Sequence, residues 1–130
     1  MTKILVVDDD TDLRGLVVHR LKAAGHRVLD APSGAAAMEL IRDKGVPDCL
    51  VLDVTMPDRN GLEVLVDIRE MTGVADLPAV FLSGRIEPKQ VAAGQALGAV
   101  YLTKPYVNSA LLHAIEAHLA KRQEALHDGW

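Results

Sequence analysis

Short apolar runs alternate with longer amphipathic segments along the chain, and this alternation restricts the possible folds more than any other feature. The runs with the length and side chains of buried strands are Ile4 to Val7, Arg27 to Asp30, Cys49 to Leu52, Ala79 to Leu82 and Val100 to Thr103. Strands that alternate with helices form a parallel sheet with crossover helices. We therefore expect an α/β fold with a doubly wound, five-stranded parallel sheet.

The intervals between these runs carry apolar residues at helical spacing together with residues that start or stop helices. Asp10 or Thr11 can cap the first helix, and Gly25 can end it in a left-handed conformation. Ser33 can cap the second helix, and Asn60 precedes the third. These signals predict a helix after each of the first three strands.

The fourth helix, roughly Pro88 to Leu97, has the weakest signal of the series. It contains Gly94 and few large apolar residues, so we expect it to be the helix that moves most easily. A last amphipathic helix is expected after Asn108, with Leu111 and Ile115 on its apolar face.

Size and composition predict one compact domain. The chain has 130 residues, of which 49% are hydrophobic, and we expect a single domain over residues 1–122 with a short tail at 123–130 and no effector domain. A net charge of -4 argues against nonspecific attraction to nucleic acid or anionic lipid. The apolar runs are too short for a membrane span or a signal peptide, so a cytoplasmic location is expected. Cys49 lies within an apolar run and is expected to be a buried hydrophobe.

Polar residues close most of the predicted strands. The first strand ends in Asp8 to Asp10, the third in Asp53, the fourth in Ser83 and the fifth in Lys104. In an open parallel α/β sheet, the loops after the carboxyl ends of the strands meet in one crevice. The sequence therefore predicts an acidic cluster that faces a single lysine.

Carboxylates gathered in this way repel one another unless a cation lies among them, and oxygen ligands suit Mg2+, with Mn2+ as a possible substitute. A carboxylate beside such an ion can attack phosphorus and form an acyl phosphate. Asp53 is placed for this attack, while Lys104 and Ser83 could bind the phosphoryl oxygens. Taken singly, each of these residues has an ordinary explanation as a helix cap, a turn residue or a solvated charge. Their joint occurrence at strand ends favours a phosphoryl-transfer site.

The motifs at these strand ends resemble those of response-regulator receiver domains. They are ILVVDDD at residues 4–10, LDVTMPDRNG at 52–61, LSG at 82–84 and YLTKP at 101–105. The resemblance covers nearly the whole chain and implies a flavodoxin-like receiver fold with strand order 2-1-3-4-5. It also implies a role in a two-component phosphorelay.

The resemblance assigns a role to each site residue. Asp8 and Asp9 would hold Mg2+ together with Asp53 and the backbone carbonyl of Thr55. Asp53 would be the phosphoacceptor. The same comparison implies that Ser83 and Lys104 bind the phosphoryl oxygens, and that Thr55 and Arg85 modulate the lifetime of the acyl phosphate.

The family likeness further implies a switch rather than an enzyme, in which the protein catalyses only its own phosphotransfer and dephosphorylation. Ser83 would move towards the phosphoryl group and Tyr101 would turn inward, which changes the surface formed by residues 87–122. The implied partners are a histidine kinase or histidine phosphotransfer protein and a downstream protein, with no direct nucleic-acid or membrane contact. The chain would be a monomer or a phosphorylation-dependent dimer.

Three alternatives were weighed against this interpretation. A phosphatase or phosphotransferase of the haloacid-dehalogenase type usually has a second aspartate two positions after the first, where this chain has Thr55. A nucleotide-binding domain would need a glycine-rich phosphate loop after a strand, and the sequence has none. A binding module independent of phosphorylation would be expected to have lost a site residue, yet the chain keeps all five of Asp8, Asp9, Asp53, Ser83 and Lys104.

Overall fold

The computed structural model describes residues 2–56, 58–84, 87–103, 110–117 and 119. Its centre is one parallel sheet with the order β2-β1-β3-β4-β5. The strands are β1 (Lys3–Val7), β2 (Arg27–Ala31), β3 (Cys49–Asp53), β4 (Ala79–Ser83) and β5 (Val100–Thr103). The predicted strand positions and strand order are confirmed.

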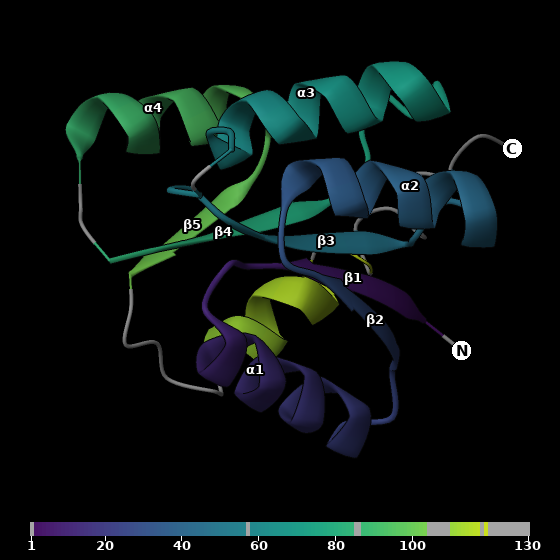
Figure 1. The fold of residues 1–130 in the computed structure, drawn as a ribbon. Coiled ribbons are helices and arrows are strands. Elements are labelled where there is room, and N and C mark those ends of the chain that lie inside the picture. Colours follow the sequence, from purple (N-terminus) through teal and green to yellow (C-terminus); the bar gives the residue numbers. More distant parts are fainter. Residues whose placement is uncertain (1, 57, 85–86, 104–109, 118, 120–130) are drawn as a thin grey trace, which may run out of the picture.

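Helices cover both faces of the sheet and make a three-layer structure (Figure 1). They are α1 (Thr11–Ala23), α2 (Gly34–Lys44), α3 (Gly61–Thr72) and α4 (Pro88–Ala96), followed by a helical segment at residues 110–117. In Figure 1, α2, α3 and α4 lie above the sheet, and α1 lies below it beside the yellow-green segment 110–117. This arrangement is the doubly wound α/β fold that the sequence predicts.

The alternation of side chains along the strands divides the core into two layers. Leu5, Leu50 and Phe81 pack on the side of α2 and α3, whereas Ile4 and Val51 pack on the side of α1 and residues 110–117. Every residue of the central strands β3 and β4 is buried. Such burial on both faces explains why these strands appear in the sequence as unbroken apolar runs.

Side chains cap the first three helices as the sequence predicts. The carboxylate of Asp10, the hydroxyl of Ser33 and the amide oxygen of Asn60 accept hydrogen bonds from backbone amides two or three residues ahead, at 2.8 to 3.2 Å. Thr11 is the first residue of α1, so Asp10 is the cap of that helix. Gly25 follows α1 with a φ of 95°, in the left-handed region that favours glycine. The helix itself ends at Ala23.

The thiol of Cys49 is fully buried in the core. Desolvation raises its pKa to about 12, so the group stays a neutral thiol at physiological pH. The interpretation of Cys49 as a buried hydrophobe is confirmed. In the part of the chain that the structure describes, no helix has the length and apolar character needed to cross a bilayer.

Candidate functional site

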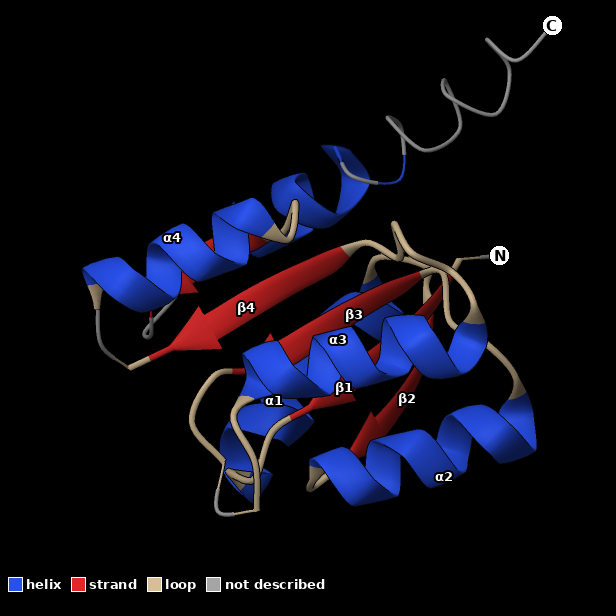
Figure 2. Cartoon of the chain, turned by 90° about the horizontal axis from the view of Figure 1, so that it is seen from above, coloured by secondary structure: helices blue, strands red, loops and turns tan. Residues whose placement is uncertain are grey.

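The carboxyl ends of the strands meet along one edge of the sheet. Asp8 follows β1, Asp53 ends β3 and Ser83 ends β4, and the parallel register aligns Asp53 with Leu82 and Ser83 with Thr103. Figure 2 shows the arrowheads of the labelled strands turned towards the same edge. The register therefore places Asp8, Asp53 and Ser83, which the sequence predicts as site residues, at the same edge of the sheet.

The carboxylates of Asp8, Asp9 and Asp53 form a compact cluster. One oxygen of each lies within 4.8 Å of one oxygen of the other two. Asp8 is 2% exposed and Asp53 is 6% exposed, while Asp9 is open to solvent. Ionised carboxylates that are buried so close together repel, and a small divalent cation with oxygen ligands offsets that repulsion. The donor set fits Mg2+ or Mn2+, with the exposed Asp9 on the solvent side.

A hydrogen-bond network fixes the position of Asp8. The amide of Asp10 donates to Oδ1 of Asp8 at 3.0 Å, and the amide of Asp8 donates to the carbonyl of Ala31 in β2 at 3.1 Å. Arg14 of α1 donates from Nη1 to the carbonyl of Asp8 at 2.7 Å and from Nε to Asp30 Oδ2 at 2.8 Å. Arg14 thus joins the loop after β1 to the end of β2.

Sequence reasoning did not identify this role of Arg14. Its carboxylate partner, Asp30, lies 16 residues away on a different element, so no local spacing links the two residues. The placement of α1 beside β2 in the folded chain brings them together.

The first turn of α3 packs directly on the backbone of Asp53. The amide of Gly61 donates to the carbonyl of Val54 at 2.8 Å, and a Cβ atom at position 61 would lie 2.2 Å from the carbonyl oxygen of Asp53. Gly61 does not have a positive φ, so this position requires glycine because of the close contact. Thr55 forms an antiparallel bridge with Asn60, which closes the loop between β3 and α3.

Ser83 lies at the edge of the sheet that carries the cluster, and Tyr101 contacts α4. Ser83 is 3% exposed at the end of β4. Tyr101 of β5 is half-buried, with its ring centroid 6.3 Å from that of Phe81, and its hydroxyl donates to Gln90 Oε1 of α4 at 3.4 Å. The sequence predicted a switch role for Tyr101 but gave no indication of Gln90 as its partner.

Two predicted site residues lie outside the described part of the chain. Lys104 was assigned to the phosphoryl oxygens and Arg85 to modulation of the acyl phosphate, and the structure places neither of them. Their roles stay predictions from the sequence. Asp8, Asp9, Asp53, Thr55 and Ser83 lie at this edge of the sheet, at or just after the ends of β1, β3 and β4, whereas Tyr101 lies within β5, paired with Phe81.

The chain is similar in sequence to known regulatory proteins. The chain is similar to the transcriptional regulatory protein PrrA of Mycobacterium tuberculosis (36% identity over 92% of this chain and 51% of that protein). It is equally similar to the transcriptional regulatory protein CpxR of Escherichia coli (36% identity over 93% of this chain and 50% of that protein). It therefore spans about half the length of these relatives.

The fold is also similar to that of a solved structure. The chemotaxis protein CheY4 of Vibrio cholerae superposes with a TM-score of 0.82 at 30% identity, over 90% of this chain and 98% of that one. Residues 4–116 match the family described as the response regulator receiver domain. The chain therefore belongs to the response regulator receiver family.

Proposed function

We propose that Asp53 accepts a phosphoryl group from the phosphohistidine of a histidine kinase or of a histidine phosphotransfer protein, in a reaction that depends on Mg2+. The observation that carries this proposal is the cluster of Asp8, Asp9 and Asp53, whose oxygens lie within 4.8 Å of one another in a chain of the receiver family. Receiver domains belong to two-component systems, and this membership implies a kinase partner.

In the proposed step, a carboxylate oxygen of Asp53 attacks phosphorus. The new O–P bond forms as the N–P bond of the phosphohistidine breaks, and the departing imidazole nitrogen keeps the electron pair and later takes up a proton. Asp8, Asp9, Asp53 and the backbone carbonyl of Thr55 would hold Mg2+ or Mn2+. When bound, the ion neutralises negative charge on the phosphoryl oxygens.

The burial of Asp53 supports its role as the nucleophile. At 6% exposure it is shielded from bulk water, so its carboxylate loses little hydration when a phosphoryl group approaches. Asp9 is exposed, and Asp8 is buried like Asp53, with Oδ1 accepting a hydrogen bond from the amide of Asp10. The resemblance to receiver domains assigns Asp8 and Asp9 to the metal ion and Asp53 to the phosphoryl group. Ser83 would donate its hydroxyl to a phosphoryl oxygen, and Lys104 would offer an ammonium group.

The acyl phosphate would then alter the surface formed by residues 87–122 through Ser83 and Tyr101. The hydrogen bond between Tyr101 and Gln90 supports this route, because a rotation of the tyrosine would release a contact with α4. The protein would act as a switch for a downstream protein, as a monomer or a phosphorylation-dependent dimer. Thr55 and Arg85 would set the lifetime of the acyl phosphate. Repeated turnover of a substrate is not part of this role.

Intact-mass measurement tests the proposal directly. After incubation with a small phosphodonor and Mg2+, the native chain should gain one phosphoryl group, and Asp53→Asn should gain none. Asp43→Asn is a matched control, because it makes the same change at an exposed position of α2. Removal of the divalent ion with a chelator should abolish labelling. Labelling of Asp53→Asn, or continuous release of phosphate from a phosphoester, would reject the assignment.

A further inference from the structure

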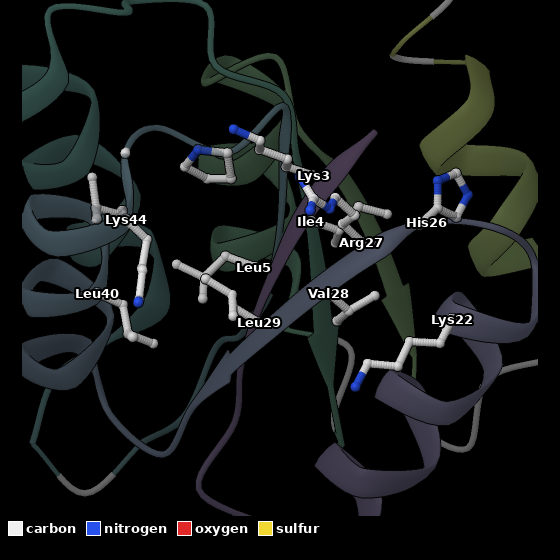
Figure 3. Close-up of a pocket in the computed structure, with 13 residues that line it drawn as sticks. Lys3, Ile4, Leu5, Lys22, His26, Arg27, Val28, Leu29, Leu40 and Lys44 are labelled. Carbon is white, nitrogen blue, oxygen red and sulfur yellow. The ribbon is translucent and has the colours of Figure 1, made fainter. Parts of the chain in front are cut away.

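A groove of about 570 Å³ follows the edge strand β2, at the end of the sheet opposite to the carboxylate cluster (Figure 3). Lys3 and Arg27, which begin β1 and β2, line it, whereas Asp8 and Asp53 lie at the carboxyl ends of their strands. The phosphoryl site and this groove are therefore separate regions of the surface.

The groove contains a free strand edge. Among the described residues, β2 pairs with β1 alone. The amide of Arg27 and the carbonyl of Ala31 point towards β1, where they are hydrogen-bonded. Because these directions alternate along a parallel strand, the amides and carbonyls of Val28 and Asp30 point to the outer side. An extended segment could hydrogen-bond to them.

Apolar side chains line the floor of the groove. Leu29 of β2 is 45% exposed, although it is a large apolar residue in the middle of a strand. Leu40 of α2 also lines the groove (Figure 3). The unpaired amides and carbonyls of an open strand edge are a template for pairing with another chain, and an exposed apolar side chain beside them adds a surface on which that chain can pack.

The charged side chains that line the groove are all basic, and the nearby carboxylate of Asp30 in β2 is paired with Arg14. Lys3, Lys22, Arg27 and Lys44 line the groove and are exposed, and no acidic residue is among its lining residues. In Figure 3, Lys44 comes from α2 on one side of β2 and Lys22 comes from α1 on the other. This basic region belongs to a chain with a net charge of -4. Lys22 and Lys44 lie in the last turns of α1 and α2, where a positive charge interacts favourably with the helix dipole. That explanation does not apply to Lys3 and Arg27, which lie on strands.

We infer that this groove binds an extended acidic segment of a partner protein, which adds as an extra strand to the free edge of β2. Backbone hydrogen bonds to Val28 and Asp30 would give affinity, and acidic side chains beside Lys22 and Lys44 would select the partner. A second copy of this chain is a poor occupant, because two-fold pairing through β2 would set the same cations against each other. A nucleic-acid duplex has no extended run of backbone amides and carbonyls, so it cannot add to the edge of β2 as a strand.

A peptide of alternating valine and glutamate is the probe for this inference. When it is titrated into the full chain, the amide NMR signals of residues 27–31 should shift. Hydrogen exchange at the amides of Val28 and Asp30 should slow on the order of tenfold at saturation, because both would become donors to the added strand. A lysine version of the peptide should not bind. A version with alternate backbone amides methylated keeps every side chain and should bind much more weakly.

Variants of the chain complete the test. Lys44→Glu should weaken binding of the acidic peptide by about tenfold at low salt, whereas Lys89→Glu, the same change on the exposed start of α4, should leave binding unchanged. Asp53→Asn should bind the peptide as the native chain does. The inference would be overturned if the methylated peptide bound equally well, if the shifts mapped outside residues 27–31, or if Lys44→Glu bound the acidic peptide as tightly as the native chain. So would anionic vesicles or a DNA duplex that reproduce the shifts when the peptide does not.

Discussion

The helices α3 and α4 cover the same face of the sheet but are held in very different ways. α3 is capped by Asn60, is followed by Gly73 in the left-handed conformation and buries Gly61, Val64, Leu65 and Ile68. α4 is shorter, its N-cap residue Glu87 makes no side-chain cap, and the only residue it buries is Gly94. Burial of apolar side chains is the main source of helix stability in a protein, so α4 has far less holding it in place.

One side chain of the firmly held helix also secures the weakly held one. Arg69 of α3 donates from Nη1 to the carbonyl of Leu97, directly after α4, at 2.7 Å, and from Nη2 to the carbonyl of Leu77 at 2.9 Å. Burial lowers the pKa of Arg69, but a guanidinium remains charged at neutral pH. The carboxyl end of α4 is therefore fixed to α3, while its amino end, where Gln90 contacts Tyr101, has the weaker attachment. The difference suits a helix that responds to Asp53 by a small movement at one end.

The largest effect is expected from Gly61→Ala, which disturbs the firmly held helix. The new Cβ would lie 2.2 Å from the carbonyl oxygen of Asp53 and 3.2 Å from the Cα of Val54, so backbone must move. We expect a loss of about 3 kcal/mol in the free energy of unfolding, measured with urea, and slower phosphorylation of Asp53.

Gly15→Ala is the matched control for that substitution. Gly15 is exposed in the middle of α1, with nothing within 4 Å of its Cβ position, so the same change should stabilise the chain by about 0.5 to 1 kcal/mol. If both variants had the same stability, the close contact between α3 and Asp53 would not be a constraint on the fold.

A smaller effect is expected from Arg69→Met, which removes the link between the two helices. The carbonyls of Leu77 and Leu97 lose their charged donor, at a cost of about 2 kcal/mol. Hydrogen exchange should accelerate at the amides of α4 more than at those of α3, because α3 keeps its own cap and core contacts.

Arg42→Met is the control for this second comparison, since Arg42 lies in the last turn of α2 and is exposed. It should change stability by no more than about 0.5 kcal/mol. Uniform acceleration of exchange in α3 and α4 of Arg69→Met would show that Arg69 supports the whole domain rather than α4 in particular.

Sequence patterns predicted most of the fold because the signals are local. The strands were found as apolar runs, and Ser33 and Asn60 were identified as caps because each lies directly before an amphipathic segment. The cluster of Asp8, Asp9 and Asp53 was predicted because parallel strands must bring their carboxyl ends together. The order of strands in a parallel sheet is therefore sufficient to bring these three carboxylates together.

The contacts that the sequence did not reveal depend on packing between distant segments. Arg69 reaches Leu97 across 28 positions, and Arg14 reaches Asp30 across 16. An arginine on an amphipathic helix is most often a solvated side chain, so neither residue differs in pattern from its exposed neighbours. Gly61 was visible in the sequence, but a glycine after a cap predicts a turn as readily as a close contact with the preceding strand.

The smallest effect, and the sharpest test of the comparison, is expected from Gly94→Ala in the weakly held helix. A Cβ at this position would lie 3.4 Å from Cδ2 of Phe81 and 3.5 Å from Cδ2 of Tyr101, which leaves room for a methyl group in contact with both rings. Because alanine also favours the helix, stability should rise by about 0.5 to 1 kcal/mol, close to the gain of Gly15→Ala. Only Gly94→Ala should slow hydrogen exchange in α4, since it adds contacts between α4 and the sheet. Slower exchange in both variants would mean that α4 opens only when the whole domain unfolds, and the contrast between α3 and α4 would then have no bearing on the switch.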